Sequence, residues 1–490
     1  MEKYILAIDE GTTNAKALLV NQKGEIVFKD SRALSVSHPQ ADWSEQDPRA
    51  IWEAVVSLLQ SCTQYSSPEA IAAIAISNQR ESVIIWDRES GEAVTPLISW
   101  QCRRSVPFCQ SLKESNIESL LIEKTGLMID PLFPAAKINW LLKNIPNGFE
   151  NAQAGHYCVG TVDTWLLWKL TGNKEFATDS SNASRTQLFN LNTQEWDQAL
   201  LDIFEVPASL LPKVNPSSCI HGETLNVDGF PNGISIASMI GDSHAALYGH
   251  KGFEEGDVKA TFGTGSSLMS VTNISKKPEH GLTKTIAWAD NYGVCQALEG
   301  NITHSGSALD WVCSIIGDIP QDSLNNIEVT APSNGGVYFV PALSGLGAPH
   351  WRTDVKATFS GIDISTTKYQ LLRAGLESIA YQVKDILDAI EQDTNQQVNK
   401  VMVDGGPTAN AWLMQFLSNL IQKPVIRNMD AEVSAIGAAF LAGQAIGWWE
   451  NHESLKALDH PVQSFYPKVG AEKAEDWYAG WKAALDRTLL

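Results

Sequence analysis

The sequence predicts an α/β protein of two similar domains that face each other across a cleft. Its 490 residues allow two or three domains, and 44% apolar with 19% charged residues are typical of a globular chain with an ample core. A pattern of strand, Gly-Thr tip and strand occurs at residues 4–20 and recurs at 257–271. Such a repeat indicates a duplicated architecture. We therefore expect an N-terminal domain over 1–251 and a C-terminal domain over 252–490.

The first copy of the repeat reads as a β-hairpin whose tip could hold phosphate. Two apolar runs too short for helices flank the segment 9–14. Gly11 suits a tight turn, and Thr12 and Thr13 add hydroxyls beside backbone N–H groups. Asp9 places a carboxylate where the first strand ends, which suggests a magnesium nucleotide. The alternative is a surface turn with solvated hydroxyls.

Strand and helix signals alternate in the rest of the N-terminal half. In order, we expect a strand at 26–28, a helix from Pro48 capped by Asp47, strands at 70–77, 83–86 and 91–100, mainly helices over 105–204, an irregular connection over 205–233, a strand at 234–240 and a helix to Gly249. Polar residues collect after three strands, at 78–81, 100–104 and 241–243. In an α/β domain this indicates a site along one edge of the sheet.

The C-terminal half repeats the first meander and then continues with helices. In order, we expect strands at 257–262 and 266–271 around the tip 263–265, strands at 285–289 and 293–298, a helix from Gly306, a strand at 398–403 and a helix with an apolar stripe from 413 to 421. Asp404-Gly405-Gly406 joins the last strand to the last helix. This Gly pair would let a ligand approach the backbone at a helix N-terminus, and the alternative is a plain helix start.

Charge and cysteine usage exclude several classes of protein. A net charge of -20 argues against non-specific binding to nucleic acid or to anionic membranes, which need a basic footprint. Seven scattered cysteines without CxxC pairs fit reduced thiols in a cytoplasmic protein. The most apolar stretch, 435–449, is too short for a membrane span and predicts a closely packed interior helix. No signal peptide is evident, so we expect a cytoplasmic location.

Taken together, these motifs resemble the FGGY family of carbohydrate kinases and, within it, the glycerol kinase branch. The resembling segments are 9–13, 43–48, 78–81, 100–104, 178–190 with its Asn-Ala-Ser-Arg-Thr core, 241–242, 263–265, 339–351, 376–382, 404–416 and 435–447. The resemblance implies two ribonuclease H-like domains, of the actin, hexokinase and heat-shock-70 type. It also implies ATP-dependent phosphorylation of a polyol or sugar hydroxyl, with Mg²⁺, in a chain that forms a homodimer or homotetramer.

For the phosphate donor, the resemblance implies a two-sided grip on ATP. Asp9 is assigned to Mg²⁺ through water. The remaining residues of the implied nucleotide site are Thr12, Thr13, Asn14 and Lys16 in the first tip, Thr264 and Gly265 in the second, and Gly306, Asp310, Gly406 and Asn410 around the nucleoside. Lys16 stands where glycerol kinases usually carry Arg, and it lacks the planar fork of Arg. Asp310 replaces their Gln, which leaves the nucleoside preference open.

For the acceptor, Asp242 is the expected catalytic base and a second Mg²⁺ ligand. The alternative for Asp242 is a helix N-cap, because Gly-Asp-Ser before a helix is a good capping sequence. Arg80 and Glu81 resemble a pair that hydrogen-bonds neighbouring hydroxyls, and the alternative is a surface ion pair. Trp100 would offer an apolar wall to the carbon chain, or could be a core aromatic.

Four departures from the glycerol kinase pattern bear on the acceptor. Leu132 replaces Tyr, Ser243 replaces Gln, Ser267 replaces Phe and Cys102 replaces Asp. Three of these changes give a smaller side chain, and the fourth exchanges a phenol for an aliphatic group. We therefore expect Leu132, Ser243 and Ser267 to line a pocket for a four- or five-carbon polyol or a ketopentose. The alternatives are a true glycerol kinase and an actin-like ATPase that binds proteins.

One further expectation concerns regulation. Glycerol kinases that are inhibited by fructose 1,6-bisphosphate carry an Arg-containing, Gly-rich loop before the strand that leads to the catalytic Asp. The corresponding segment here, 229–235, contains no Arg. We expect no inhibition by that sugar.

Overall fold

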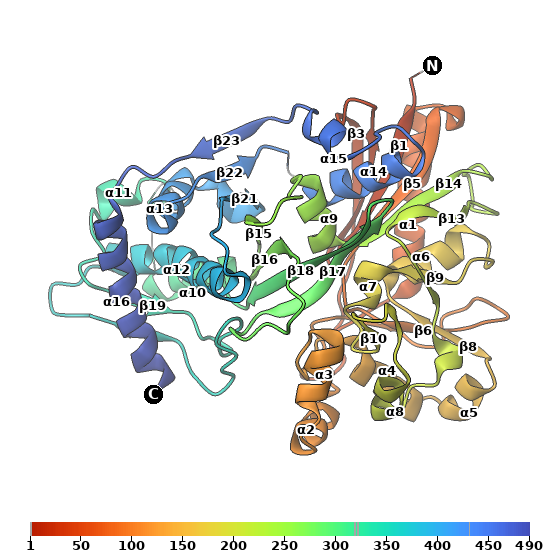
Figure 1. Ribbon diagram of the computed structural model, residues 1–490, viewed down its shortest axis with the longest axis horizontal. Helices are drawn as coiled ribbons and strands as arrows, with labels where there is room; N and C mark the ends of the chain where they lie inside the picture. Colours follow the sequence, from red (N-terminus) through yellow and green to blue (C-terminus); the bar gives the residue numbers. More distant parts are fainter. Residues whose placement is uncertain (1, 318–319, 321–322, 431) are drawn as a thin grey trace. The chain divides into compact units, whose positions relative to one another are not determined.

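A computed structural model describes residues 2–317, 320, 323–430 and 432–490, which form two compact units (Figure 1). The first unit contains Met1–Lys251, Lys284–Gln296 and Glu432–Asp459, and the second contains Gly252–Thr283, Ala297–Ala431 and His460–Leu490. The first long segment of the chain therefore ends where we placed the domain division. Two later segments, which we assigned to the C-terminal domain, pack with the first unit instead.

The first unit is built on a six-stranded sheet in the order β13-β14-β5-β1-β2-β3. Its strands are β1 (Tyr4–Glu10), β2 (Asn14–Val20), β3 (Ile26–Ala33), β5 (Ile71–Asn78), β13 (Ser218–Glu223) and β14 (Ser235–Gly241). β1, β2 and β3 form the expected antiparallel meander, while β5 lies parallel to both β1 and β14. We expected an irregular connection over 205–233. This expectation is wrong for β13, which pairs antiparallel with β14 at the edge of the sheet.

Helices pack against this sheet through apolar residues. α1 (Pro48–Tyr65) and α6 (Val162–Leu170) share a buried core with β1, β5 and β14. Asp47 caps α1 as expected, because its side chain accepts from the N–H of Arg49. α9 (Asp242–Gly249) and α14 (Val433–Ala445) pack against each other, and α14 also packs against β1, β5 and β14.

α14 confirms the interior helix that we expected within 435–449, since most of its residues are buried. A Cβ at Gly437 would collide with the carbonyl oxygen of Ala245, so only glycine allows α9 and α14 to approach this closely. No helix in the part of the chain that the structure describes is long and apolar enough to cross a membrane.

A set of smaller elements extends the first unit around a second core. They are β4 (Glu45–Gln46), β6 (Ile84–Asp87), β7 (Leu97–Ile98), α2 (Val106–Glu114), α3 (Glu118–Thr125), α4 (Pro134–Asn144), α5 (Gly148–Gln153), β8 (Tyr157–Gly160), β9 (Ala177–Asp179), α7 (Ser180–Ala183), β10 (Phe189–Asn190), β11 (Glu195–Trp196), α8 (Gln198–Phe204) and β12 (Lys213–Asn215). Their core includes Ile98, Leu141 and Phe204. The region 105–204 is thus mainly helical as expected, with four short strands between the helices.

Apart from Lys284–Gln296, which belongs to the first unit, the second sheet lies in the second unit and has seven strands in the order β17-β18-β16-β15-β21-β22-β23. Its strands are β15 (Asp257–Phe262), β16 (Ser266–Thr272), β17 (Thr283–Asp290), β18 (Gly293–Ile302), β21 (Lys400–Asp404), β22 (Val425–Asn428) and β23 (Val462–Phe465). β15 pairs antiparallel with β16 and parallel with β21. This arrangement repeats that of β1 with β2 and β5 in the first unit, which confirms the duplicated hairpin.

Long helices share the core of the second sheet. The remaining elements of this unit are α10 (Gly306–Ile316), α11 (Ile327–Thr330), β19 (Tyr338–Val340), β20 (Thr358–Ser360), α12 (Lys368–Thr394), α13 (Ala411–Ile421) and α16 (Ala471–Leu489). Val258, Val401 and Phe262 pack in one cluster with residues of α12, α13 and α16. α13 confirms the predicted apolar stripe, because Leu413, Phe416, Leu417, Leu420 and Ile421 are all buried.

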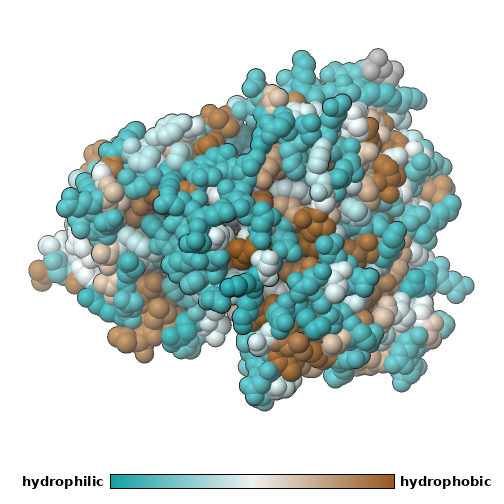
Figure 2. Space-filling model, in the orientation of Figure 1, coloured by the Kyte–Doolittle hydropathy of each residue, from teal (hydrophilic) through white to brown (hydrophobic). Residues whose placement is uncertain are grey.

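The face of the molecule drawn in Figure 2 is mainly polar. Figure 2 shows hydrophilic residues over most of the visible face, with hydrophobic residues in small separate groups.

Candidate active site

The carboxyl ends of three parallel strands meet at one edge of the first sheet. Glu10 of β1 pairs with Asn78 of β5, and Asn78 pairs with Gly241 of β14. The polar residues that follow these strands are therefore level with one another. Parallel strands commonly place ligand-binding groups at this edge. The structure thus brings Asp9, Arg80 and Asp242 to the same edge, as the strand-end pattern predicts.

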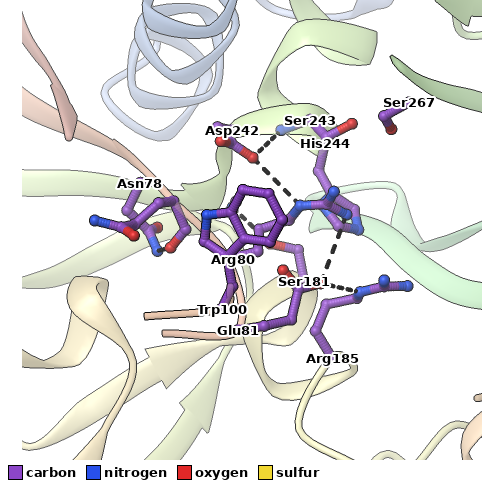
Figure 3. Close-up of polar contacts among 12 residues, drawn as sticks. Asn78, Arg80, Glu81, Trp100, Ser181, Arg185, Asp242, Ser243, His244 and Ser267 are labelled. Carbon is purple, nitrogen blue, oxygen red and sulfur yellow. Dashed lines mark hydrogen bonds and ion pairs between the residues drawn. The ribbon is translucent and has the colours of Figure 1, made fainter. Parts of the chain in front are cut away.

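Asp242 is the first residue of α9 and does not cap the helix. The N-cap is Gly241, and the Asp242 carboxylate accepts from the N–H of its neighbour Ser243 at 2.6 Å. The N-cap position expected for Asp242 in the alternative is thus held by Gly241. Nε of Arg80 lies 3.2 Å from Oδ1 of Asp242, whose side chain is 41% exposed (Figure 3). Asp242 thus combines a fixed orientation with access to solvent, which a catalytic base requires.

Arg80 and Glu81 are almost fully buried, so the alternative of a surface ion pair is wrong. Their side chains are only 10% and 6% exposed. A Cβ at Gly241 would lie 2.7 Å from Cγ of Arg80, so the glycine leaves room for the Arg80 side chain to reach Asp242. Nε of Arg185 donates to Oε1 of Glu81 at 2.7 Å. The pair is a buried polar group next to Asp242, suited to binding hydroxyls.

The first tip is a tight turn in which the N–H of Gly11 donates to the carbonyl of Asn14 at 3.0 Å. Thr13 and Asn14 are exposed, and Nδ2 of Asn14 donates to the Thr13 hydroxyl at 3.1 Å. Thr12 accepts from Nε1 of Trp100 at 2.9 Å through its hydroxyl. Trp100 is 38% exposed and is not a core aromatic. The structure therefore joins the predicted acceptor wall to the predicted phosphate tip.

Asp9 lies under the first tip and carries a shifted pKa. Burial raises the pKa of its carboxyl to about 6, although hydrogen bonding from Ser77 and the charge of Lys16 lower it and the charge of Asp242 raises it further. Ser77 donates to Oδ1 at 2.8 Å. Lys16 itself pairs with Glu432, with Nζ 2.6 Å from Oε2. Its charge is therefore partly neutralised at the position where the nucleotide is expected.

A buried polar network behind the tip was not expected from the sequence. Nε2 of Gln79 donates to both carboxyl oxygens of Glu10 at 3.2 Å and to Oε1 of Gln46 at 2.8 Å. Nε2 of Gln46 in turn donates to the carbonyl of Thr12 at 2.9 Å. Burial raises the pKa of Glu10 to about 8, although the hydrogen bond from Gln79 lowers it. Through Gln46, the network holds the backbone of the first tip at Thr12.

The second tip packs on the first turn of α10. The carbonyl of Thr264 accepts from the N–H groups of Ser305 at 2.9 Å and Ser307 at 3.1 Å. The N–H of Gly306 donates to the carbonyl of Gly263 at 3.0 Å. A Cβ at Gly306 would lie 2.6 Å from that carbonyl oxygen, so glycine is required for this contact. Thr264 and Gly306, predicted to bind different parts of the nucleotide, are therefore neighbours.

The other predicted nucleoside residues lie on α10 and on the connection from β21 to α13. Asp310 is exposed on α10, one turn after Gly306. Gly406 begins a short 3-10 turn, and nothing lies within 4 Å of a Cβ placed there, so its backbone is open to a ligand. Asn410 caps α13 by accepting from the N–H of Leu413, and its amide donates to the carbonyl of Leu324 at 3.0 Å. The side chain of Asn410 thus caps α13, as in the plain helix start that we considered as the alternative to a ligand site after Gly405-Gly406.

The three predicted pocket residues fall in different units. Leu132 and Ser243 belong to the first unit, and Ser267 belongs to the second, where its hydroxyl donates to Oε1 of Glu299 at 3.0 Å. Cys102 is buried, and Nε of Arg104 lies 3.0 Å from its Sγ. This fourth departure thus contacts a structural arginine rather than the cluster around Asp242.

Sequence reasoning missed two buried cations beside the predicted acceptor residues. Arg185 follows α7, and Lys137 lies in α4 with its Nζ donating to the carbonyl of Glu81 at 2.9 Å. The available signals were an Arg inside the family-like segment 178–190 and a Lys within the otherwise apolar start of α4. A buried charge without a local partner indicates a long-range polar contact.

The carboxylates at this edge fit a magnesium ion held through water and phosphate. The described residues contain no group of three or more His, Cys, Asp and Glu side chains that could hold a metal ion by themselves. Mg²⁺ commonly takes one or two carboxylates and keeps several waters. Asp9 and Asp242 supply two carboxylates, and the charge of Asp242 raises the pKa of Asp9. A cation bound there would relieve this repulsion.

Comparisons with known proteins agree with this geometry. Residues 4–249 match the N-terminal domain of the FGGY family of carbohydrate kinases, and residues 258–446 match its C-terminal domain. The chain is 48% identical to an apulose kinase of Pectobacterium atrosepticum over 488 residues, covering 99% of this chain and 98% of that protein. It is 42% identical to a glycerol kinase of Bacillus anthracis, covering 100% and 99%.

Solved structures have the same fold. The glycerol kinase of Plasmodium falciparum with ADP gives a TM-score of 0.94 at 31% identity, covering 100% of this chain and 99% of that one. A xylulose kinase of Lactobacillus acidophilus gives 0.89 at 23% identity, covering 99% and 97%, a likeness of fold alone.

Proposed function

The chain belongs to the FGGY family of carbohydrate kinases, phosphotransferases with an alcohol group as acceptor, and we propose that it phosphorylates a polyol or sugar larger than glycerol at the expense of ATP. The observation that carries this proposal is the contact between Arg80 and Asp242 at the edge that also holds Asp9 and the first tip. A base, a hydroxyl-binding pair and a phosphate tip in one place are what phosphoryl transfer requires.

Asp242 acts as the base in this proposal. Its carboxylate accepts the proton of the acceptor hydroxyl as the oxygen of that hydroxyl forms a bond to the γ-phosphorus and the bond from that phosphorus to the β-phosphate oxygen breaks. Arg80 orients Asp242 and, with Glu81, hydrogen-bonds neighbouring hydroxyls of the acceptor. The buried position of this pair strengthens such bonds, since water competes less there.

In this proposal the nucleotide is ATP with Mg²⁺, and each tip offers candidate phosphate contacts within its own unit. Thr12, Thr13 and Asn14 lie at the first tip, and Thr264 and Gly265 lie at the second. Asp9 and Asp242 would hold the Mg²⁺, which when bound neutralises charge on the phosphate oxygens. The net charge of -20 makes such local contacts necessary for an anionic substrate.

The acceptor is proposed to be larger than glycerol because three pocket positions depart from the glycerol kinase pattern. Ser243 and Ser267 are smaller than the Gln and Phe usual at those positions. Leu132 is apolar where Tyr, with a phenol hydroxyl, is usual. The 48% identity to an apulose kinase, against 42% to a glycerol kinase, supports a sugar acceptor. A four- or five-carbon polyol or a ketopentose fits these changes. The second candidate is glycerol itself, because the Arg80, Glu81 and Trp100 pattern is shared with glycerol kinases.

A coupled assay for ADP release tests the proposal. The acceptors are glycerol, erythritol, threitol, the pentitols, ribulose, xylulose and apulose, each with MgATP. We expect kcat/KM for at least one larger acceptor to exceed that for glycerol by tenfold or more, as pocket fit can supply. A kcat/KM for glycerol above all others would contradict the larger acceptor. ADP release that no acceptor accelerates would favour an actin-like ATPase. The cytoplasmic location and a homodimeric or homotetrameric state stay predictions.

A further inference from the structure

Glu81 has a backbone conformation that its side chain type rarely adopts. Its φ is 60°, in the left-handed region that favours glycine. A non-glycine residue stays there only when its surroundings fix it in place. Two buried cations contact Glu81 (Figure 3 shows the first): Arg185, in the turn after α7, at the side chain, and Lys137 of α4 at the backbone.

Arg185 fixes the carboxylate. Its Nε donates to Oε1 of Glu81 at 2.7 Å, and the two side chains are 1% and 6% exposed. The Arg185 guanidinium carbon lies 5.2 Å from the centroid of the Phe133 ring, which limits its movement. Nη1 of Arg80 lies 4.0 Å from the same Oε1. The carboxylate is thus held between the acceptor-binding Arg80 and a second arginine that is buried behind it.

Lys137 fixes the backbone and links it to a second loop. Its side chain is fully buried in α4, and Nζ donates to the carbonyl of Glu81 at 2.9 Å and to the carbonyl of Leu132 at 2.5 Å. Burial lowers the pKa of Lys137 to about 8, because removal from water disfavours the charged ammonium. One ammonium group therefore joins two segments that both contribute predicted acceptor residues.

We propose that Lys137 and Arg185 are positioning residues that hold Glu81 and Leu132 at a fixed separation and thereby set which acceptors the site takes. This inference rests on the proposed function. Neither cation touches the acceptor. Arg185 aligns the carboxylate that accepts from an acceptor hydroxyl, and Lys137 prevents the Leu132 loop from moving independently of Glu81. A displacement of about 1 Å at such a group can cost roughly 100-fold in rate.

The test compares Lys137→Met and Arg185→Lys with the wild type in the same ADP-release assay. Met keeps most of the Lys volume without a donor, and Lys keeps the Arg charge without its fork. We expect each variant to raise KM for the preferred acceptor at least tenfold while KM for ATP changes less than twofold. We also expect the ratio of kcat/KM between that acceptor and glycerol to fall at least fivefold.

Lys124→Met is the matched control. Lys124 lies in the same part of the first unit and pairs with Asp197 at 2.6 Å, without contacting Glu81. We expect Lys124→Met to lower Tm and leave the acceptor KM and the specificity ratio unchanged. If Lys137→Met does not fold, Arg185→Lys carries the test through a double-mutant cycle with Glu81→Gln. Coupling requires that Arg185→Lys change the acceptor KM less in the Glu81→Gln background than in the wild type.

The outcomes separate this inference from the proposed function. If the wild type releases no ADP in response to any acceptor, the proposed function fails. If the wild type is active but the folded variants keep the wild-type acceptor KM and specificity ratio, the positioning roles are refuted while the function stands. The same holds if the effects of Arg185→Lys and Glu81→Gln on the acceptor KM are additive.

Discussion

Arg80 and Asp242 contact each other at 3.2 Å although 162 positions separate them in the chain, because β5 and β14 are parallel neighbours whose ends are level. Gly241 makes the contact possible, since a Cβ there would collide with the Arg80 side chain. The pair joins the predicted base to the predicted hydroxyl-binding group. The predicted binding of the acceptor and the predicted removal of its proton therefore both depend on the register between β5 and β14.

The acceptor preference should move toward glycerol when the three departures are reversed. In the variant Leu132→Tyr, Ser243→Gln, Ser267→Phe, we expect kcat/KM for glycerol relative to the best larger acceptor to rise at least about tenfold, because the larger side chains leave less room for the acceptor. Competition assays with both acceptors measure this ratio. Cys102→Asp is the control, because Cys102 contacts Arg104 and an Asp at this position would pair with the same arginine. A triple variant with an unchanged ratio would show that these positions do not set acceptor size.

The second phosphate tip should not tolerate a side chain at Gly265. A Cβ there would lie 3.0 Å from the carbonyl oxygen of Thr303 and closer still to that of Ile302, both backbone atoms that cannot move alone. We expect Gly265→Ala to raise KM for ATP about tenfold or more and to lower Tm, as measured by initial rates and calorimetry. Gly470→Ala, where the added Cβ meets open space, should change neither. Equal effects of the two substitutions would contradict a close-packed tip.

Glu10 should make stability depend on pH between about 5 and 8. Its ordinary pKa is 4.5, and burial, with smaller contributions from the charges of Asp9 and Asp242, raises its pKa to about 8 in the folded chain. In that range the folded state holds a proton that the unfolded state has lost, so the free energy of unfolding falls as pH rises. Glu10→Gln should remove this contribution and flatten the pH dependence of Tm by roughly 5 °C.

The matched control for Glu10 is an exposed carboxylate. Glu195→Gln, on β11, should show the same pH dependence of Tm as the wild type. A Glu10→Gln variant with a Tm profile parallel to that of the wild type from pH 5 to 8.5 would contradict a pKa of Glu10 that burial raises in the folded chain.

Local patterns predicted the parts of the site that are built within one strand and its turn. Both tips, the strand ends at Asn78 and Gly241 and the start of α1 at Asp47 follow from short-range turn and capping chemistry. The repeat predicted a second sheet with the same hairpin. The fold of both halves could therefore be inferred before the structure.

Contacts between distant segments could not be predicted in this way. The bond from Arg185 to Glu81 spans 104 positions, and the bond from Lys137 to Glu81 spans 56. The apolar composition of α14 indicates a buried helix but not its partner, and its packing on the first unit follows only from the tertiary fold. The left-handed conformation of Glu81, which these distant contacts surround, also has no local signal.

The most direct test of the whole account is the rate of ADP formation by Asp242→Asn with saturating MgATP and the preferred acceptor. The amide keeps the size of the side chain but cannot take the proton, so we predict a loss of kcat of roughly 100- to 10,000-fold. Circular dichroism and Tm should stay close to the wild type, since Asp242 is 41% exposed and does not cap α9. A folded Asp242→Asn variant that retains the full acceptor-dependent rate would contradict the assignment of Asp242 as the base.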